Sequence, residues 1–385
     1  MKIPVKYNFR SLLVRRVSTA MTVLGIGLTV GIVVVLLAMI QGLDRTFTET
    51  GDPLNLIVLR KSSGSEVNSY FLRGIFETIR FLPGVARDEK NEPLAVGELV
   101  VVISLRRADG SEGNVVIRGT SERGFRLRPE VQIVEGRVFR SGVRELILSR
   151  SLLRRFPGLA LGGTIDINNQ PWRIVGIFDA GTTAYASEMW TGYQDVAEVW
   201  ERPIYSSILL RAESPEAVAE LKKRISDDRR LQLDAFSQPE YFADQTVTSV
   251  GLKVLATLVA LIMGIGSCFA VMNMMYGQVM SRSQEVATLR AIGFRRRHIL
   301  SSFVMESLLL GLAGGLVGCA LGSLFHGYSA GTSNLVSFSE VVFNFRVTPE
   351  ILIQGLAYAL VVGLLGGFLP ARRAATVKLI DVLRE

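Results

Sequence analysis

Four long apolar runs constrain this chain most. The runs at 17–43, 254–280 and 351–369 contain no charged side chain, and the run at 299–325 contains only Glu306. A helix needs about 20 apolar residues to cross a hydrocarbon core, and each run is close to that length or longer. We therefore predict an α-helical membrane bundle of four transmembrane helices, at 18–43, 254–280, 299–326 and 349–370.

The first run could also be a secretory signal peptide. Such a peptide has an apolar region of about 7–15 residues and ends at a small-residue cleavage site. The run at 17–43 is longer and lacks that ending, so we predict a retained anchor. The segment 1–17 before it is basic and contains no acid. We expect residues 7–16 to form an amphipathic helix along the inner membrane face.

Basic residues flank the runs on one side of the predicted membrane. They gather in the segments 1–17, 281–298 and 371–385, whereas the segments 44–253 and 327–348 lie on the other side. Because basic flanks remain in the cytoplasm, we predict a multi-pass protein of the cell inner (plasma) membrane with both termini cytoplasmic.

The segment 44–253 contains no spanning run and is large enough for a core of its own. Alternating apolar residues predict strands at 54–59, 99–106, 115–118, 146–149, 164–167 and 172–178, and helical spacing predicts a helix at 70–81. Near its end, Ser214 and Pro215 are a typical helix start, between two further strands. We predict a large α+β extracytoplasmic domain, inserted between the first and second helices, with a β-rich insert at 96–190.

The loop at 281–298 is short and strongly basic. Val286, Leu289 and Ile292 follow at three-residue steps, which predicts a short helix with one apolar stripe, and Gly293 is a plausible helix stop. On charge alone, the arginines of this loop need do no more than orient the membrane helices.

Small residues recur at four-residue steps in three of the runs. Such steps let helix backbones approach closely in lipid, either at a movable interface between protomers or in static packing within one bundle. The glycines concerned are Gly27, Gly31, Gly311, Gly315, Gly318, Gly322, Gly363 and Gly367.

Glu306 lies two turns into the third span. A carboxylate at that depth is a candidate proton relay or substrate site. The alternative, which we favour, is that it snorkels to the inner interface or pairs with Arg297 or His298.

Other chemistry is poorly represented. The chain contains no G-x-x-x-x-G-K-[ST], H-E-x-x-H or G-x-S-x-G motif, so we expect no ATP hydrolysis or other enzyme activity from this chain alone. Cys268 and Cys319 both lie in apolar runs, and the two histidines are far from both. We therefore predict no metal site. The net charge of +8 comes from residues beside the membrane runs, so we expect no nucleic acid partner.

The loop also carries an ordered motif. Asn273 and Met274 precede it, and Arg282, Glu285, Val286, Leu289, Arg290, Ala291, Ile292 and Gly293 follow in the order R-x-x-E-V-x-x-L-R-A-I-G. This segment resembles the cytoplasmic loop of the FtsX/MacB-type family of ABC transporter permeases. The resemblance implies that the loop docks on an ATPase, with Glu285, Leu289, Arg290 and Gly293 in the coupling element.

Two further stretches resemble the same family. They are the start of the chain, NFRSLLVRRVSTAMTVLGIGLTVGI, and the phrase from EGRVF to WRIVGIF in the large domain, which is similar to a periplasmic core domain. The resemblance implies two copies of a separate ABC ATPase subunit, which would hold the ATP and Mg, and a second permease protomer. A periplasmic adaptor or an outer-membrane channel is a further implied partner, and no cofactor is implied for this chain.

These observations predict the permease subunit of an ABC transporter, in which ATP hydrolysis moves the extracytoplasmic domain to export or extract a substrate. The substrate classes left open are a lipoprotein, a lipid, a drug, a peptide and a glycan. One alternative is a non-transporting regulator that activates an extracytoplasmic cell-wall hydrolase. Another is an ATP-independent sensor or adhesion module, which would leave the loop motif unexplained.

Overall fold

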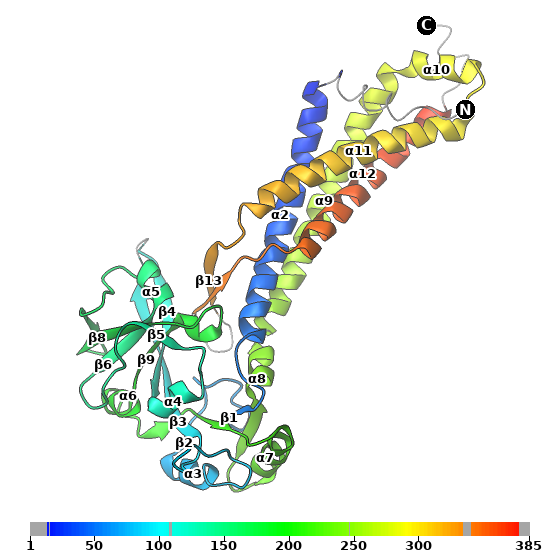
Figure 1. Cartoon of the computed structure of the whole chain (residues 1–385). Helices are drawn as coiled ribbons and strands as arrows, with labels where there is room; N and C mark the ends of the chain where they lie inside the picture. Colours follow the sequence, from blue (N-terminus) through cyan, green and yellow to red (C-terminus); the bar gives the residue numbers. More distant parts are fainter. Residues whose placement is uncertain (1–13, 15, 108–109, 246, 334–339, 377–385) are drawn as a thin grey trace. The chain divides into compact units, whose positions relative to one another are not determined.

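The computed structural model describes residues 14, 16–107, 110–245, 247–333 and 340–376. The chain divides into two compact units (Figure 1). The helical unit comprises residues 1–42, 251–328 and 345–385, and the inserted domain comprises residues 43–250 and 329–344. The amphipathic helix predicted at 7–16 falls almost entirely outside the described residues.

In its described residues, the helical unit contains four long helices and one short helix. Within the described part of the chain, the four long helices are the ones long and apolar enough to cross a membrane. The helices are α2 (Arg16–Thr48), α9 (Val247–Ser281), α10 (Ser283–Ala291), α11 (Arg296–Ser323) and α12 (Pro349–Thr376). Each predicted span lies on one of the long helices, except that α11 ends before residue 326.

The glycines that the sequence analysis singled out lie where α11 crosses α2 and α12. A Cβ added at Gly318 would lie 2.6 Å from the Gly27 carbonyl oxygen on α2. One added at Gly311 would lie 2.7 Å from the Ala359 carbonyl oxygen on α12, and one at Gly363 would lie 2.7 Å from the Ser307 carbonyl oxygen. Because lipid supplies no hydrophobic drive between helices, this close backbone approach is what holds the three together.

The inserted domain contains twelve strands along the main part of its chain and a hairpin from the segment between α11 and α12. The strands are β1 (Asn55–Arg60), β2 (Phe71–Leu72), β3 (Ala95–Arg106), β4 (Glu112–Thr120), β5 (Gln132–Gly136), β6 (Glu145–Ser149), β7 (Thr164–Ile167), β8 (Gln170–Asp179), β9 (Glu188–Gly192), β10 (Ile204–Tyr205), β11 (Ser207–Arg211), β12 (Leu233–Ser237), β13 (Ser329–Ser333) and β14 (Glu340–Asn344).

Among the described residues, six short helices and one 3-10 turn complete the domain together with the sheet. They are α3 (Arg73–Ile79), α4 (Glu122–Arg126), α5 (Arg150–Arg155), η1 (Ala184–Ser187), α6 (Tyr193–Val199), α7 (Pro215–Asp227) and α8 (Gln238–Gln245), the last of which leads into α9. The start predicted for α7 is confirmed, since the Ser214 hydroxyl accepts a hydrogen bond from the Ala217 N–H at 3.2 Å and Pro215 is the first helical residue.

One mixed sheet runs through the domain. Its strand order is β12-β1-β11-β3-β4-β9-β6-β8-β5, and β7 pairs with β8. The strands of the β-rich insert predicted at 96–190 share this sheet with strands outside that range, because β3 pairs with β11. The loop expected at 327–348 likewise contains the β13–β14 hairpin. Both corrections concern pairing between distant segments, which local alternation of apolar residues does not specify.

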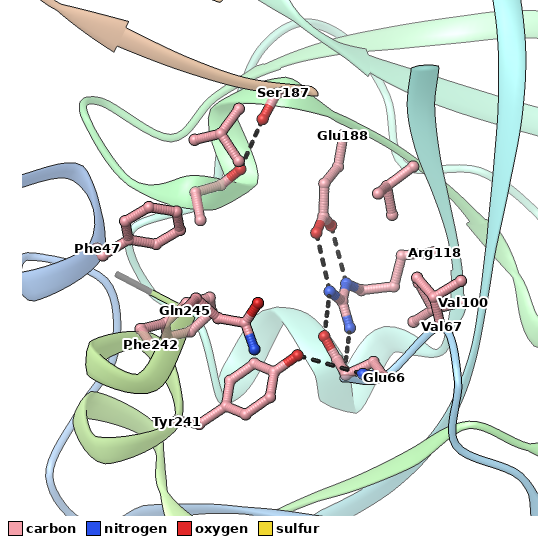
Figure 2. A pocket seen from close by; sticks show the side chains of 13 residues that line it. Phe47, Glu66, Val67, Val100, Arg118, Ser187, Glu188, Tyr241, Phe242 and Gln245 are labelled. Carbon is pink, nitrogen blue, oxygen red and sulfur yellow. Dashed lines mark hydrogen bonds and ion pairs between the residues drawn. The ribbon is translucent and has the colours of Figure 1, made fainter. Parts of the chain in front are cut away.

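Arg118 on β4 lies at the centre of a buried cluster of charges (Figure 2). Its guanidinium donates five hydrogen bonds of 2.8–2.9 Å to Glu66, Glu98 and Glu188, which uses all five of its N–H groups. Arg128 donates two more to Glu98, each at 2.7 Å. The three carboxylates come from the loop after β1, from β3 and from β9, so the cluster joins segments that are distant in sequence.

Opposing effects act on the pKa of Glu98. Burial raises it, but the guanidinium groups of Arg128 and Arg118 outweigh burial and lower the pKa from 4.5 to about 2. A carboxylate whose pKa is depressed in the folded state stabilises the fold above its unfolded pKa. That stabilisation is therefore present above pH 4.5 and is lost as the pH falls towards 2.

The glycine contacts predict the effect of a single added methyl group. Gly318→Ala should lower the free energy of unfolding of the helical unit by about 1–3 kcal/mol, because the new Cβ meets a backbone oxygen that cannot move aside. The matched control is Gly25→Ala on α2, where an added Cβ meets nothing within 4 Å. Thermal melting of the full chain followed by circular dichroism would test this, and equal melting of the two variants would contradict it.

The charge cluster predicts an acid-dependent loss of stability. Glu98→Gln should lower the unfolding free energy of the inserted domain by about 3–5 kcal/mol at pH 7, because it leaves two guanidinium groups buried with one carboxylate fewer. Its unfolding should also depend less on pH between 4.5 and 2 than that of the wild type.

Tryptophan fluorescence in urea can follow this in the full chain, since Trp172, Trp190 and Trp200 are its only tryptophans and all lie in the inserted domain. Glu77→Gln is the control, because the Glu77 side chain is 57% exposed in its ion pair with Arg80. The unfolding free energy of this control variant should fall by no more than about 1 kcal/mol. Equal losses in the two variants would show that Arg118 and Arg128 do not depend on Glu98.

Candidate functional site

The motif predicted as a coupling element forms α10, the short helix between α9 and α11. Helix α9 ends at Ser281, and Arg282 breaks the helical path with a φ of −116° and a ψ of 16°. A new helix then begins at Ser283, with its first backbone hydrogen bond from the Val286 N–H to the Arg282 carbonyl oxygen at 3.0 Å. The chain thus presents α10 as an element separate from the spanning helices on either side.

One side of α10 is buried in the helical unit. Val286 is 4% exposed and Ala287 is 3% exposed, and Val286 belongs to the core cluster that contains Ile299 and Phe303 of α11. The predicted stripe of three apolar residues is wrong, because Leu289 is half-buried and Ile292 is 68% exposed. Successive residues of a helix turn by about 100° around its axis. Ile292 comes six positions after Val286, so it lies far from the buried face.

Gly293 ends α10 in a Schellman arrangement. Its φ is +106°, in the left-handed region that glycine adopts without strain. The Phe294 N–H donates to the Leu289 carbonyl oxygen at 3.1 Å, and the Gly293 N–H donates to that of Arg290 at 3.1 Å. These two bonds satisfy carbonyl groups that the helix leaves free, and they fix the direction in which the chain continues to α11.

Arg282 anchors α10 to α11. Its guanidinium bonds Glu306 at 3.1 Å and Glu285 at 3.2 Å, and it lies 5.4 Å from the centre of the Phe303 ring. The prediction that Glu306 snorkels is wrong, because its side chain is only 1% exposed. Glu306 does form an ion pair, and Arg282, which was not among the predicted partners, is one member of it. The Arg282–Glu306 ion pair therefore ties the start of α10 to α11.

The opposite side of α10 and the turn after it are exposed. The Glu285 side chain is 58% exposed, Ile292 is 68% exposed, and Ala291 and Gly293 are also exposed. The three arginines 295–297 that follow are exposed as well, whereas Arg290 is half-buried. An apolar residue surrounded by charges on a rigid element has the composition of a protein docking surface.

The charge cluster around Arg118 was missed by the sequence analysis. A signal was present, because Glu98 and Arg118 each interrupt an apolar strand and Glu188 is the first residue of another. Beside the cluster lies a cavity of about 50 Å³, lined by Glu66, Arg118 and Glu188 together with Phe47 and the α8 residues Tyr241, Phe242 and Gln245 (Figure 2). In the part of the chain that the structure describes, no group of three or more His, Cys, Asp or Glu side chains could hold a metal ion.

Two family models match the chain. The model of the MacB-like periplasmic core domain matches residues 19–228, and the model of the FtsX-like permease C-terminal region matches residues 257–379. The second match contains α10, α11 and α12, and the first contains most of the inserted domain.

The chain is also similar to named relatives. It is 23% identical to the uncharacterized ABC transporter permease YknZ of Bacillus subtilis, over 99% of this chain and 98% of that protein. It is 25% identical to the macrolide export ATP-binding/permease protein MacB of Chromobacterium violaceum and 27% identical to the pyoverdine export ATP-binding/permease protein PvdT of Pseudomonas savastanoi. The chain spans 58% and 59% of the lengths of these two proteins.

Two solved structures align with part of the chain. The extracellular domain of YknZ aligns with 48% of this chain at 16% identity and a TM-score of 0.37. The periplasmic region of MacB from Actinobacillus actinomycetemcomitans aligns with 51% at 12% identity and a TM-score of 0.37. The match of the core-domain model over more than half of the residues, followed by that of the permease model, shows that the chain belongs to the MacB-type family of ABC transporter permeases.

Proposed function

We propose that this permease couples ATP hydrolysis by a separate ATPase subunit to movement of its inserted domain. The observation that carries the proposal is the division of α10 into two sides. One side is fixed to α11 by Val286 and by the Arg282–Glu306 ion pair, and the other side leaves Ile292 and Glu285 exposed. An element that is both anchored and exposed can receive a push from a bound partner and pass it on.

The packing of α11 supports the second half of this proposal. Glycines bring its backbone against α2 on one side and α12 on the other, with no side chain between them at the closest points. Closely packed helices move as rigid bodies and pass small displacements across their contacts. A displacement of α10 would therefore reach α2 and α12 through α11. We infer mechanotransmission of this kind, which needs no cavity through the membrane.

The family of this chain and the position of its basic residues together suggest how the complex is assembled. The exposed arginines 295–297 beside α10 support a cytoplasmic position for this loop. That position would put both termini in the cytoplasm and the inserted domain outside. We propose a complex of two permease protomers and two ATPase subunits, with ATP and Mg held by the ATPase and with an adaptor or an outer-membrane channel as a further partner. The names of two relatives, which mention macrolide and pyoverdine export, support an exported substrate.

A non-transporting regulator of a cell-wall hydrolase is the second candidate. A short, coiled extracytoplasmic segment would favour it. The inserted domain is instead a ten-stranded sheet with its own core, which supports the transport proposal.

The exposed side of α10 predicts where the ATPase docks. Ile292→Glu should reduce the co-purification of the ATPase and the stimulated ATP hydrolysis about tenfold or more, because it buries a charge in the interface. The control is Val143→Glu, which changes an apolar residue of the inserted domain that is 58% exposed. ATPase activity of the complex in lipid nanodiscs measures both variants. Full activity of Ile292→Glu would rule out docking at this surface.

The Arg282–Glu306 ion pair on the anchored side of α10 predicts an effect on stability. Glu306→Gln alone should lower the free energy of unfolding by about 3 kcal/mol, because it removes the buried charged partner of Arg282, whose other ion pair is with the exposed Glu285. The double variant Arg282→Met/Glu306→Leu should recover much of this loss, since apolar side chains can replace a buried ion pair.

Melting of the full chain compares the stability of the single and the double variants. ATPase binding should survive in the double variant, because Ile292 and Glu285 are unchanged. If the single and the double variants melt alike, the two residues do not act as a pair.

A further inference from the structure

The 3-10 turn η1 is bonded to the segment that leaves the first membrane helix. The Thr50 hydroxyl oxygen accepts a hydrogen bond from the Ala184 N–H at 2.8 Å, and the Glu49 carboxylate accepts one from the Thr182 hydroxyl at 2.8 Å. Thr50 is fully buried and follows α2 by two residues. Its contact therefore holds the segment that follows α2 against η1.

The same turn is bonded to the segment that leads into the second membrane helix. In α8, the fully buried Gln238 donates a hydrogen bond through Nε2 to the Tyr185 hydroxyl at 2.6 Å. The Phe242 ring packs edge-on against the Tyr185 ring, with centroids 5.8 Å apart and planes at 90°. Helix α8 ends at Gln245, and α9 begins at Val247.

Gln238 also joins the outgoing and the returning segments directly. Its side-chain oxygen accepts hydrogen bonds from the Asp52 N–H at 3.0 Å and from the Asn55 side chain at 3.1 Å. Gly51 has a φ of +106°, and a Cβ added there would lie 2.8 Å from Cγ of Gln238. The two segments are thus in contact, with no space for a side chain between them.

Behind η1 lies the charge cluster of the sheet. The Arg128 guanidinium lies 4.8 Å from the centre of the Tyr185 ring, and that of Arg118 lies 5.5 Å from it. The cavity beside the cluster has a volume of about 50 Å³. Its lining includes Arg118 and the α8 residues Tyr241 and Phe242 (Figure 2). This volume can hold one or a few waters, so α8 can shift slightly here without a clash between packed side chains.

We propose that η1, residues 49–52 and α8 form a joint that passes displacement of α2 and α9 to the ten-stranded sheet through Tyr185 and Arg118. The inference rests on the proposed function and extends it to named residues of the inserted domain. Three segments that share buried hydrogen bonds move together, and the sheet takes up their movement because the buried charge cluster permits few other arrangements. The alternative is a static attachment that holds the segments in place and carries no movement.

Hydrogen exchange of the whole complex in lipid nanodiscs tests the joint, with ATP and orthovanadate compared with no nucleotide. The variant is Tyr185→Phe, which removes only the hydroxyl that Gln238 bonds. The matched control is Tyr193→Phe, which removes the hydroxyl that bonds the Ile204 carbonyl oxygen at 3.1 Å elsewhere in the domain.

In the wild type and in the control, we expect nucleotide to change exchange both in α10 and in η1 and β9. In Tyr185→Phe the change in α10 should persist, and the change in η1 and β9 should fall about fivefold, the factor that one hydrogen bond commonly represents. A second variant, Val100→Ile, fills part of the cavity without removing a hydrogen bond. It should also reduce the nucleotide-dependent change in β9 while leaving α10 unaffected.

Three other outcomes would contradict the proposed joint, and each gives a different pattern of hydrogen exchange. A static attachment would make Tyr185→Phe exchange faster at η1 by the same factor with and without nucleotide. Wild-type complexes in which α10 responds but β9 does not would refute the joint and leave the proposed function intact. If α10 itself shows no response to nucleotide, the proposed function fails, and the joint fails with it.

Discussion

The inserted domain depends on the hydrogen bonds of one buried guanidinium. Arg118 uses all five of its N–H groups to hold carboxylates from a loop and two strands beside its own. Any arrangement that buried Glu66, Glu98 or Glu188 without Arg118 would leave a desolvated carboxylate, which is costly. We infer that the cluster selects the one pairing of β3, β4 and β9 in which every charge has a partner. The position of η1 follows, since Tyr185 packs against the two guanidinium groups.

The helical unit obeys a different constraint. Burial of apolar side chains does not favour helix association in lipid, so shape and a few polar contacts decide which faces meet. Glycines bring α11 against α2 and α12, and the Arg282–Glu306 ion pair fixes α10 against α11. The same ion pair gives α10 a buried side and an exposed side, and this division is the basis of its proposed role. In both units, therefore, an arginine that bonds a buried glutamate positions the element that we connect with function.

Several elements could be predicted because their signals are local. A spanning helix needs only a continuous apolar run, and the start of α7 needs only Ser214 and Pro215 next to each other. The family resemblance of the α10 motif was also seen from the order of its residues. Its geometry was not, since the partner of Glu306 lies 24 residues away and the exposure of Ile292 depends on which side of α10 meets α11. The joint around Gln238 was missed for the same reason, because its bonding partners are 53 and 186 residues distant.

The sequence by itself determined the four apolar helices, the insertion of a large α+β domain after the first of them, and the motif that identifies the family. These properties are set by the composition and spacing of neighbouring residues, which act before any tertiary contact forms. Tertiary structure alone decided that the strands form one continuous sheet, that Arg118 gathers three carboxylates, and that η1 holds the segments on both sides of the domain. Those contacts join residues far apart along the chain, and only the packing of the whole domain shows which buried charges and polar groups become partners.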